Sequence, residues 1–275
     1  MSTGRGRRDL LVALAQWLPV PGEHDMNLES AMGWIEKAGA AGADLVVLPE
    51  LWPSGYDTST LKENVLAAAE PLPGPRSEKL GALARQLAIW VFAGSVPEWD
   101  GELIYNTAIV LDREGALVAR HRKIHLYSPT GEDKIFAAGS SLTTFVDEEL
   151  GNVGLTVCFD GDFPETARSL GARGSDLVVQ VNAYEKEAES YWDLLYPAAA
   201  LANGQWWLLA NQCGSTKTGT LLGASRVISP AGEIVAQAQR AGLGETPLAE
   251  LLLCRMGESS ETESARGFAQ LLRVG

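Results

Sequence analysis

The stretch 151–165 constrains this chain most, because it joins a buried strand to a helix through a sharp turn. Residues 153–157 are apolar and partly β-branched, which favours a buried strand that ends at Cys158. An Asp-Gly-Asp turn signal follows, and Asp162 then has the pattern of a helix N-cap, with proline and glutamate soon after it. The stretch predicts a cysteine presented at the carboxyl end of a strand, as in a nucleophile elbow. A small core cysteine is the alternative.

The rest of the chain alternates between apolar strand-like segments and segments with helical periodicity. Strands are expected at 9–17, 44–48, 89–96, 104–111, 117–120, 176–181, 206–211, 223–229 and 233–238, and helices at 27–40, 59–70, 76–88, 165–173 and 191–203. Such alternation predicts layered α/β packing, in which ligands bind at the carboxyl ends of strands. Glu50 and Cys158 both stand at such ends.

The chain shows no segment that would divide it into domains. None of the interior loops among its 275 residues is long or biased enough to mark a boundary, and no repeat has a solenoid period. We expect one domain over residues 9–255, preceded by a flexible Gly/Arg/Ser-rich segment at 1–8. The polar tail at 256–275 is expected to fray or to contact a partner subunit.

Charge and cysteine usage exclude several classes of partner. A formal net charge of −13 argues against a general nucleic-acid or anionic-membrane binder, and no apolar run is long enough to span a bilayer. There is no signal-peptide pattern, and three widely spaced cysteines fit a reducing compartment, so a cytoplasmic location is expected. His121 and His125 stand four apart, but no third ligand accompanies them, so no metal is expected.

Three short motifs follow one another along the chain: Leu-Pro-Glu50, Arg-Lys123-Ile-His-Leu and Cys158-Phe-Asp-Gly-Asp-Phe-Pro-Glu. The lysine stands 73 residues after the glutamate, and the cysteine stands 35 residues after the lysine. In order and spacing they resemble the signatures of the nitrilase, or carbon–nitrogen hydrolase, superfamily, over roughly residues 9–240. The resemblance implies a four-layer α-β-β-α sandwich, no cofactor, and a homodimer or larger homo-oligomer.

The motif residues are the groups that hydrolysis of an amide needs. Cys158 would attack the carbonyl carbon, while Glu50 would take the thiol proton and later deliver one to departing ammonia. Lys123 and the backbone N–H of Phe159 would hold the oxyanion. The resemblance adds Glu132, which matches a glutamate that positions the substrate or the lysine. Each residue also has a purely structural alternative: Glu50 could cap the next segment, Lys123 could be a solvated strand end, and Glu132 could be a charge on a loop.

Further residues that follow strands are candidates for the substrate pocket. Besides Phe159, substrate contacts are expected from Tyr56, Asn182, Tyr184 and Glu185. With Trp52 and Glu187, these side chains predict an aromatic and acidic mouth. Such a mouth favours an amide whose far end is apolar or cationic rather than a carboxylate.

The segment that begins at Cys158 resembles the Cys-x-Asp-Gly pattern of aliphatic amidases and formamidases more than the Cys-Trp-Glu of nitrilases proper. We therefore expect an amidase that releases ammonia from a small primary amide through a cysteine thioester. The alternatives are an N-carbamoyl amidohydrolase, a nitrilase, and an inactive interaction protein on the same fold. Ala224 departs from the family pattern, since relatives often carry histidine there, which leaves details of the pocket open.

Overall fold

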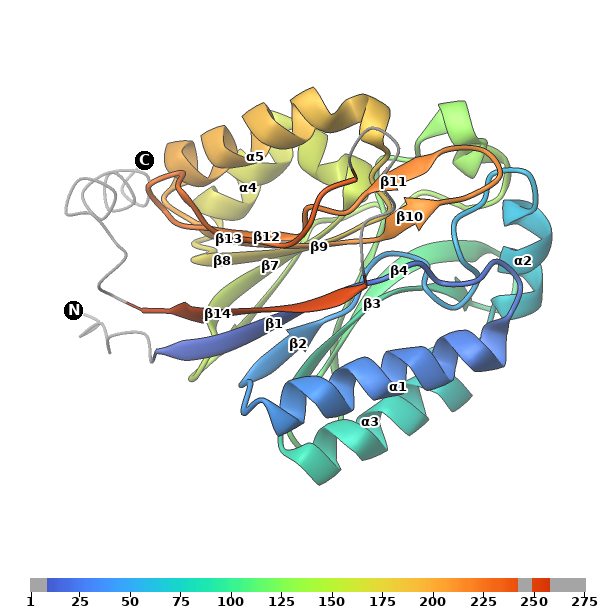
Figure 1. Ribbon diagram of the computed structural model, residues 1–275, viewed down its shortest axis with the longest axis horizontal. Coiled ribbons are helices and arrows are strands. Elements are labelled where there is room, and N and C mark those ends of the chain that lie inside the picture. Colours follow the sequence, from blue (N-terminus) through green and yellow to red (C-terminus); the bar gives the residue numbers. More distant parts are fainter. Residues whose placement is uncertain (1–8, 242–248, 258–275) are drawn as a thin grey trace.

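Two six-stranded sheets form the centre of the computed structural model, which describes residues 9–241 and 249–257 (Figure 1). In order across the first sheet, the strands are β14 (Glu250–Met256), β1 (Leu10–Gln16), β2 (Leu45–Val47), β3 (Trp90–Trp99), β4 (Ile104–Leu111) and β5 (Leu117–Arg122). Across the second they are β13 (Ile234–Gln237), β12 (Arg226–Ile228), β9 (Trp206–Asn211), β8 (Leu177–Asn182), β7 (Gly151–Val157) and β6 (Thr143–Asp147). A small hairpin joins β10 (Cys213–Ser215) to β11 (Thr220–Leu222).

Helices cover the outer face of each sheet. The covering helices are α1 (His24–Ala40), α3 (Pro75–Leu87), α4 (Pro164–Ala172) and α5 (Glu189–Asn203), whereas α2 (Leu61–Ala68) lies at one end of the sandwich. Figure 1 shows α1 and α3 on the outer side of the first sheet, and α4 and α5 on the outer side of the second. The layers therefore run helix, sheet, sheet, helix, which confirms the expected four-layer sandwich.

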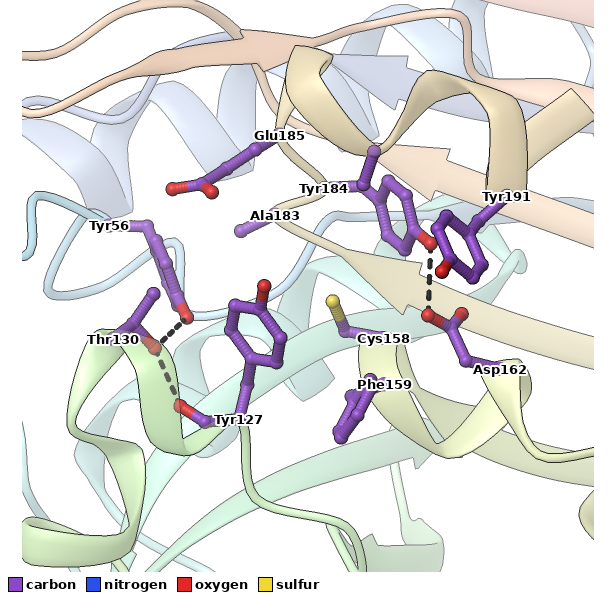
Figure 2. Close-up of a pocket in the computed structure, with 11 residues that line it drawn as sticks. Tyr56, Tyr127, Thr130, Cys158, Phe159, Asp162, Ala183, Tyr184, Glu185 and Tyr191 are labelled. Atoms are coloured by element: carbon purple, nitrogen blue, oxygen red, sulfur yellow. Dashed lines mark hydrogen bonds between the residues drawn. The ribbon is translucent and has the colours of Figure 1, made fainter.

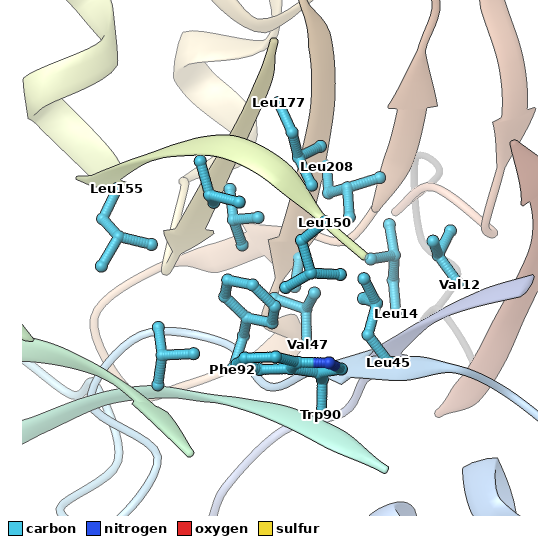
Figure 3. Close-up of a cluster of buried hydrophobic side chains, with 14 of the residues drawn as sticks. Val12, Leu14, Leu45, Val47, Trp90, Phe92, Leu150, Leu155, Leu177 and Leu208 are labelled. Atoms are coloured by element: carbon cyan, nitrogen blue, oxygen red, sulfur yellow. The ribbon is translucent and has the colours of Figure 1, made fainter. Parts of the chain in front are cut away.

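Successive side chains of the central strands point to opposite faces of the sheet, and both faces are covered. In β1, Val12 and Leu14 point into the space between the sheets, while Ala13 and Ala15 pack under the helices. The layer between the sheets is filled by buried side chains of both, among them Phe92 and Leu208 (Figure 3). A strand that is apolar on both faces appears in the sequence as a continuous apolar run, which is why these strands could be located.

The centre of each sheet is parallel, and this brings the ends of distant strands together. β1, β2 and β3 run parallel in one sheet, and β7, β8 and β9 run parallel in the other. Parallel strands point their carboxyl ends to the same edge. The segments that follow β2 and β8 meet at this edge, where the Glu50 N–H donates to the Asn182 carbonyl at 3.3 Å.

Some elements differ from the sequence expectation. β6, β14 and the β10–β11 hairpin were not expected, and α5 begins at Glu189 rather than at residue 191. Asp162 is not a helix N-cap, because α4 begins at Pro164 with Phe163 in the cap position. Residues Cys158–Asp162 instead form a 3₁₀ turn, and the Asp162 carboxylate accepts hydrogen bonds from Tyr184, which follows β8, and from Tyr196 of α5.

Two expectations fall on chain ends. Residues 1–8 and nearly all of the tail at 256–275 lie outside the described residues. Within residues 9–241 and 249–257, no helix combines the length and apolarity that crossing a bilayer requires.

Candidate active site

Three charged side chains from separate parts of the chain meet in the interior. Glu50 follows β2, Lys123 follows β5, and Glu132 begins a short 3₁₀ turn. The Lys123 Nζ donates to Glu50 Oε1 at 3.0 Å, and it lies 2.9 and 2.8 Å from the two oxygens of Glu132. All three side chains have no exposed surface. One ammonium thus bridges two buried carboxylates.

Glu50 is held in place through both of its carboxylate oxygens. Oε1 accepts from Asn106 Nδ2 at 2.8 Å as well as from Lys123, and Oε2 accepts from the Ala183 N–H at 2.8 Å. Its backbone carbonyl accepts from Gln212 Nε2 at 2.7 Å. Burial raises the pKa of Glu50, and Lys123 opposes this rise only in part. A carboxyl group with a raised pKa is suited to take a proton and return it.

Lys123 remains an ammonium ion despite its burial. Burial by itself disfavours the charged amine, but the Glu132 and Glu50 carboxylates together raise the pKa of Lys123 well above its usual value. Glu132 is fixed in turn, since it accepts from the Tyr56 hydroxyl at 2.9 Å and from the Tyr127 N–H at 2.9 Å. The site therefore keeps a fixed positive charge whose position is set by two carboxylates.

Cys158 directly follows β7 and has an uncommon backbone conformation. Its φ of +46° lies in the left-handed region, where a residue other than glycine costs about 1–3 kcal/mol of strain. The turn after it is closely packed, because a Cβ on Gly161 would overlap the side chain of Gln180. The side chain of Cys158 stays partly exposed and lines a cavity. The structure thus presents this cysteine to a cavity at a strand end instead of packing it fully in the core.

Asp160 holds the turn that carries the cysteine. Its Oδ1 accepts backbone N–H groups of Ile124 at 3.0 Å and His125 at 2.8 Å, and its Oδ2 lies 3.0 Å from His121 Nε2. Oδ2 also accepts the Val157 N–H at 3.2 Å. Burial opposes ionisation, but these hydrogen bonds keep the pKa of Asp160 well below its usual range. An ionised Asp160 therefore ties the segment after Lys123 to the turn after β7.

The surroundings of Cys158 favour the protonated form of its thiol. Burial raises its pKa well above the ordinary value, and the Glu50 carboxylate raises it further, against the opposing effect of Lys123. The thiol therefore needs a base to become a nucleophile. Among the charged groups around the thiol, the Glu50 carboxylate has the largest effect on the pKa of Cys158.

A cavity of ≈ 240 Å³ opens beside Cys158 (Figure 2). Of the predicted substrate contacts, Tyr56, Phe159, Tyr184 and Glu185 line it. Asn182 does not, because its amide is buried and donates to the carbonyls of Gln180 and Ala210, which corrects the expectation for this residue. This volume is below the range of typical ligand pockets, so the cavity fits a small molecule.

Other expectations for the mouth of the cavity were also only partly met. Trp52 is fully buried and donates its indole N–H to the Ala93 carbonyl at 2.7 Å, and Glu187 is exposed outside the cavity. Sequence reasoning missed Asp162, Tyr127 and Tyr191, which do line it. The only sequence signal for Asp162 as a lining residue was its position close to Cys158, but its local pattern favoured a helix N-cap instead.

The two histidines of the lysine motif do not form a metal site. His121 Nε2 and His125 Nδ1 both face the Asp160 carboxylate, at 3.0 and 2.9 Å. In the part of the chain that the structure describes, no group of three histidine, cysteine or acidic side chains is arranged to hold a metal ion. The histidines instead hold the aspartate that supports the turn.

The chain is similar in sequence to carbon–nitrogen hydrolases. Residues 11–258 match the family model for carbon–nitrogen hydrolases. The omega-amidase NIT2-B of Xenopus laevis is 34% identical over 244 residues, which are 86% of this chain and 85% of that protein. The human omega-amidase NIT2 is 33% identical over 77% of this chain and 78% of its own length.

Solved structures agree with this placement. Saccharomyces cerevisiae Nit3, a member of branch 10 of the nitrilase superfamily, superposes with a TM-score of 0.83 at 26% identity over 98% of this chain and 97% of its own. A mutant of the amidase from Nesterenkonia sp. AN1 gives a TM-score of 0.79 at 27% identity, covering 98% and 95% of the two chains. That mutant shows covalent addition of the acetamide moiety of fluoroacetamide at its active-site cysteine. With its matching family model, fold and motifs, the chain belongs to the carbon–nitrogen hydrolase family of the nitrilase superfamily.

Proposed function

We propose that this protein is an amidase that hydrolyses a small primary amide to a carboxylic acid and ammonia through a thioester on Cys158. The observation that carries the proposal is the buried set of Glu50, Lys123 and Glu132 next to a cysteine that opens into a small cavity. The omega-amidases and the amidase among the relatives support the choice of an amide as substrate.

In the first half-reaction, the substrate carbonyl carbon sits against the Cys158 sulfur. Glu50 accepts the thiol proton as the sulfur–carbon bond forms, and the carbonyl oxygen becomes an oxyanion. The Lys123 ammonium and the Phe159 N–H stabilise that oxyanion. Glu50 then gives its proton to the amide nitrogen, the carbon–nitrogen bond breaks, and ammonia leaves behind a thioester.

In the second half-reaction, water takes the place of ammonia. Glu50 accepts a proton from the water as its oxygen attacks the thioester carbon, and the same two donors stabilise the second oxyanion. The carbon–sulfur bond breaks, Glu50 passes the proton that it took from water to the sulfur, and the carboxylic acid leaves. Glu132 does not need to exchange a proton; it keeps Lys123 charged and in position throughout.

The proposal is tested by measuring ammonia release from a panel of primary amides, N-carbamoyl compounds and nitriles. We expect turnover of amides that is lost in Cys158→Ala and kept in the matched variants Cys213→Ala and Cys254→Ala. Carbon dioxide release from carbamoyl compounds with little amide turnover would instead support the N-carbamoyl amidohydrolase. Full amide turnover in Cys158→Ala would refute the mechanism, and no turnover in the whole panel would refute the proposed function.

A further inference from the structure

The ionisable side chains that line the cavity are acidic. Among the side chains that line the cavity, the ionisable acids are Asp162 and Glu185, and none is lysine, arginine or histidine. Lys123, deeper in the site, is already paired with two carboxylates. Lys186, next along the chain from Glu185, is directed elsewhere, since its ammonium donates to the Ala241 carbonyl at 2.8 Å. A substrate carboxylate in this cavity would face two acids, and no free cation is found among the described residues that line it.

The two acids differ in how far the protein already satisfies them. Asp162 accepts hydrogen bonds from the hydroxyls of Tyr184 at 2.9 Å and Tyr196 at 2.7 Å. Glu185 is half-buried, and no cationic or hydrogen-bonding side chain of the described residues pairs with its carboxylate. Burial raises its pKa, with a smaller contribution from the neighbouring Glu187, and a bound cation would offset both effects. Glu185 is thus the acid with free capacity to bind a ligand.

Aromatic rings make up most of the rest of the wall. Tyr56, Tyr127, Tyr184 and Tyr191 all line the cavity together with Phe159. Figure 2 shows the Asp162 carboxylate on the side of Tyr184 and Tyr191, and the Glu185 carboxylate on the side of Tyr56. Tyrosine rings accept both alkyl chains and cations, since the ring face is apolar and electron-rich.

We propose that the acyl group of the substrate carries a cationic group at its far end, bound by Glu185 and the surrounding tyrosine rings. This inference rests on the proposed amidase function and names the class of its substrate: a short primary amide with a terminal amine or guanidine. In the bound pose, the amide carbon lies at Cys158 and the methylene chain lies along the rings. The cation then reaches Glu185, the carboxylate of the wall that has no side-chain partner among the described residues.

Three primary amides of equal chain length test the inference: one ends in an ammonium group, one in a methyl group and one in a carboxylate. We expect the wild-type enzyme to show the highest kcat/KM for the cationic amide and the lowest for the carboxylate. In Glu185→Gln, the ratio of kcat/KM for the cationic amide over that for the methyl-terminated amide should fall roughly tenfold or more, the usual scale for loss of a charge-assisted hydrogen bond. Added salt should lower the same ratio in the wild-type enzyme.

Glu187→Gln is the matched control, because it removes an equal charge two residues away on an exposed side chain. It should leave the ratio nearly unchanged. Titration calorimetry of the three amides with Cys158→Ala measures the same preference without turnover. If the methyl-terminated amide is hydrolysed but the cationic one has no advantage, or Glu185→Gln leaves the ratio unchanged, the inference is overturned while the amidase function stands. If none of the amides binds or reacts, both are overturned.

Discussion

Replacing Glu50 by glutamine tests the proposed base most sharply, because the side chain keeps its shape and loses its ability to take up a proton. A positioned general base or acid typically contributes about 10²–10⁴-fold to the rate, and here one group serves both half-reactions. We expect kcat/KM to fall by this factor, which corresponds to about 2.7–5.4 kcal/mol at 1.36 kcal/mol for each tenfold change.

The same variant should also lose stability, for a reason that the structure makes explicit. The Glu50 carboxylate accepts from Asn106 and Lys123 on one oxygen and from the Ala183 N–H on the other. A glutamine amide accepts through one oxygen only, so its NH₂ group faces a donor in either orientation. A buried donor without a partner costs about 1–3 kcal/mol, and Tm should fall by roughly 3–10 °C.

Ammonia-release kinetics and thermal melting of the same preparation separate the two effects. Glu98→Gln is the control, since Glu98 is also a buried carboxylate, held by Thr107 and Arg122, but does not line the cavity. Glu98→Gln should have a lower Tm than the wild-type enzyme but the same kcat/KM. A loss in Glu50→Gln of less than about tenfold, or an equal loss in Glu98→Gln, would refute the role of Glu50 as the base.

Three other outcomes follow from the same contacts. Lys123→Ala should lower kcat/KM by about 10²–10³ through loss of an oxyanion donor, with the deficit seen in kcat; a change confined to KM would contradict this. Because burial raises the pKa of Glu50 above its ordinary 4.5 and the base must be ionised, kcat/KM should fall with decreasing pH at a pKa above 4.5, and an acid limb below it would contradict the assignment. Asp160→Asn should lower Tm by roughly 5 °C at neutral pH. The pKa of Asp160 is depressed in the folded state, so its ionised carboxylate stabilises the fold fully above the unfolded pKa of about 3.9. This stabilisation is lost as the pH falls toward the folded pKa. The difference in Tm between the wild-type enzyme and Asp160→Asn should therefore narrow only below about pH 4.

Much of the fold could be predicted because the central strands are apolar on both faces. Such strands appear in the sequence as short continuous runs between turn signals, and each expected strand has a counterpart in the structure. β14 was missed although Glu250–Met256 is largely apolar, because it pairs with β1 more than 200 residues away and no local signal shows this. β6 was missed as well, since it is a short strand at the sheet edge with mixed polarity.

Some candidate site residues could be selected from the sequence because they stand directly after a predicted strand. Glu50 and Cys158 stand at strand ends, and parallel strands bring such ends to one edge, whereas Glu132 was found only through the family resemblance. Asn106 could not be found, because it lies within β4 and not at a strand end, and only the tertiary packing brings its amide to Glu50. Asp162 was misassigned because one local pattern fits both an N-cap and a tyrosine-bound carboxylate.

The claim that Cys158 carries the acyl group through a thioester is tested most directly by mass spectrometry of the enzyme during turnover. The protein is mixed with a primary amide that it hydrolyses, quenched with acid after a few milliseconds to seconds, and its intact mass and proteolytic peptides are measured. The account predicts an added mass equal to the acyl group, located on the peptide that contains Cys158 and absent from Cys158→Ala. An adduct on the peptide of Cys213 or Cys254, or continued turnover without any adduct in Cys158→Ala, would contradict it.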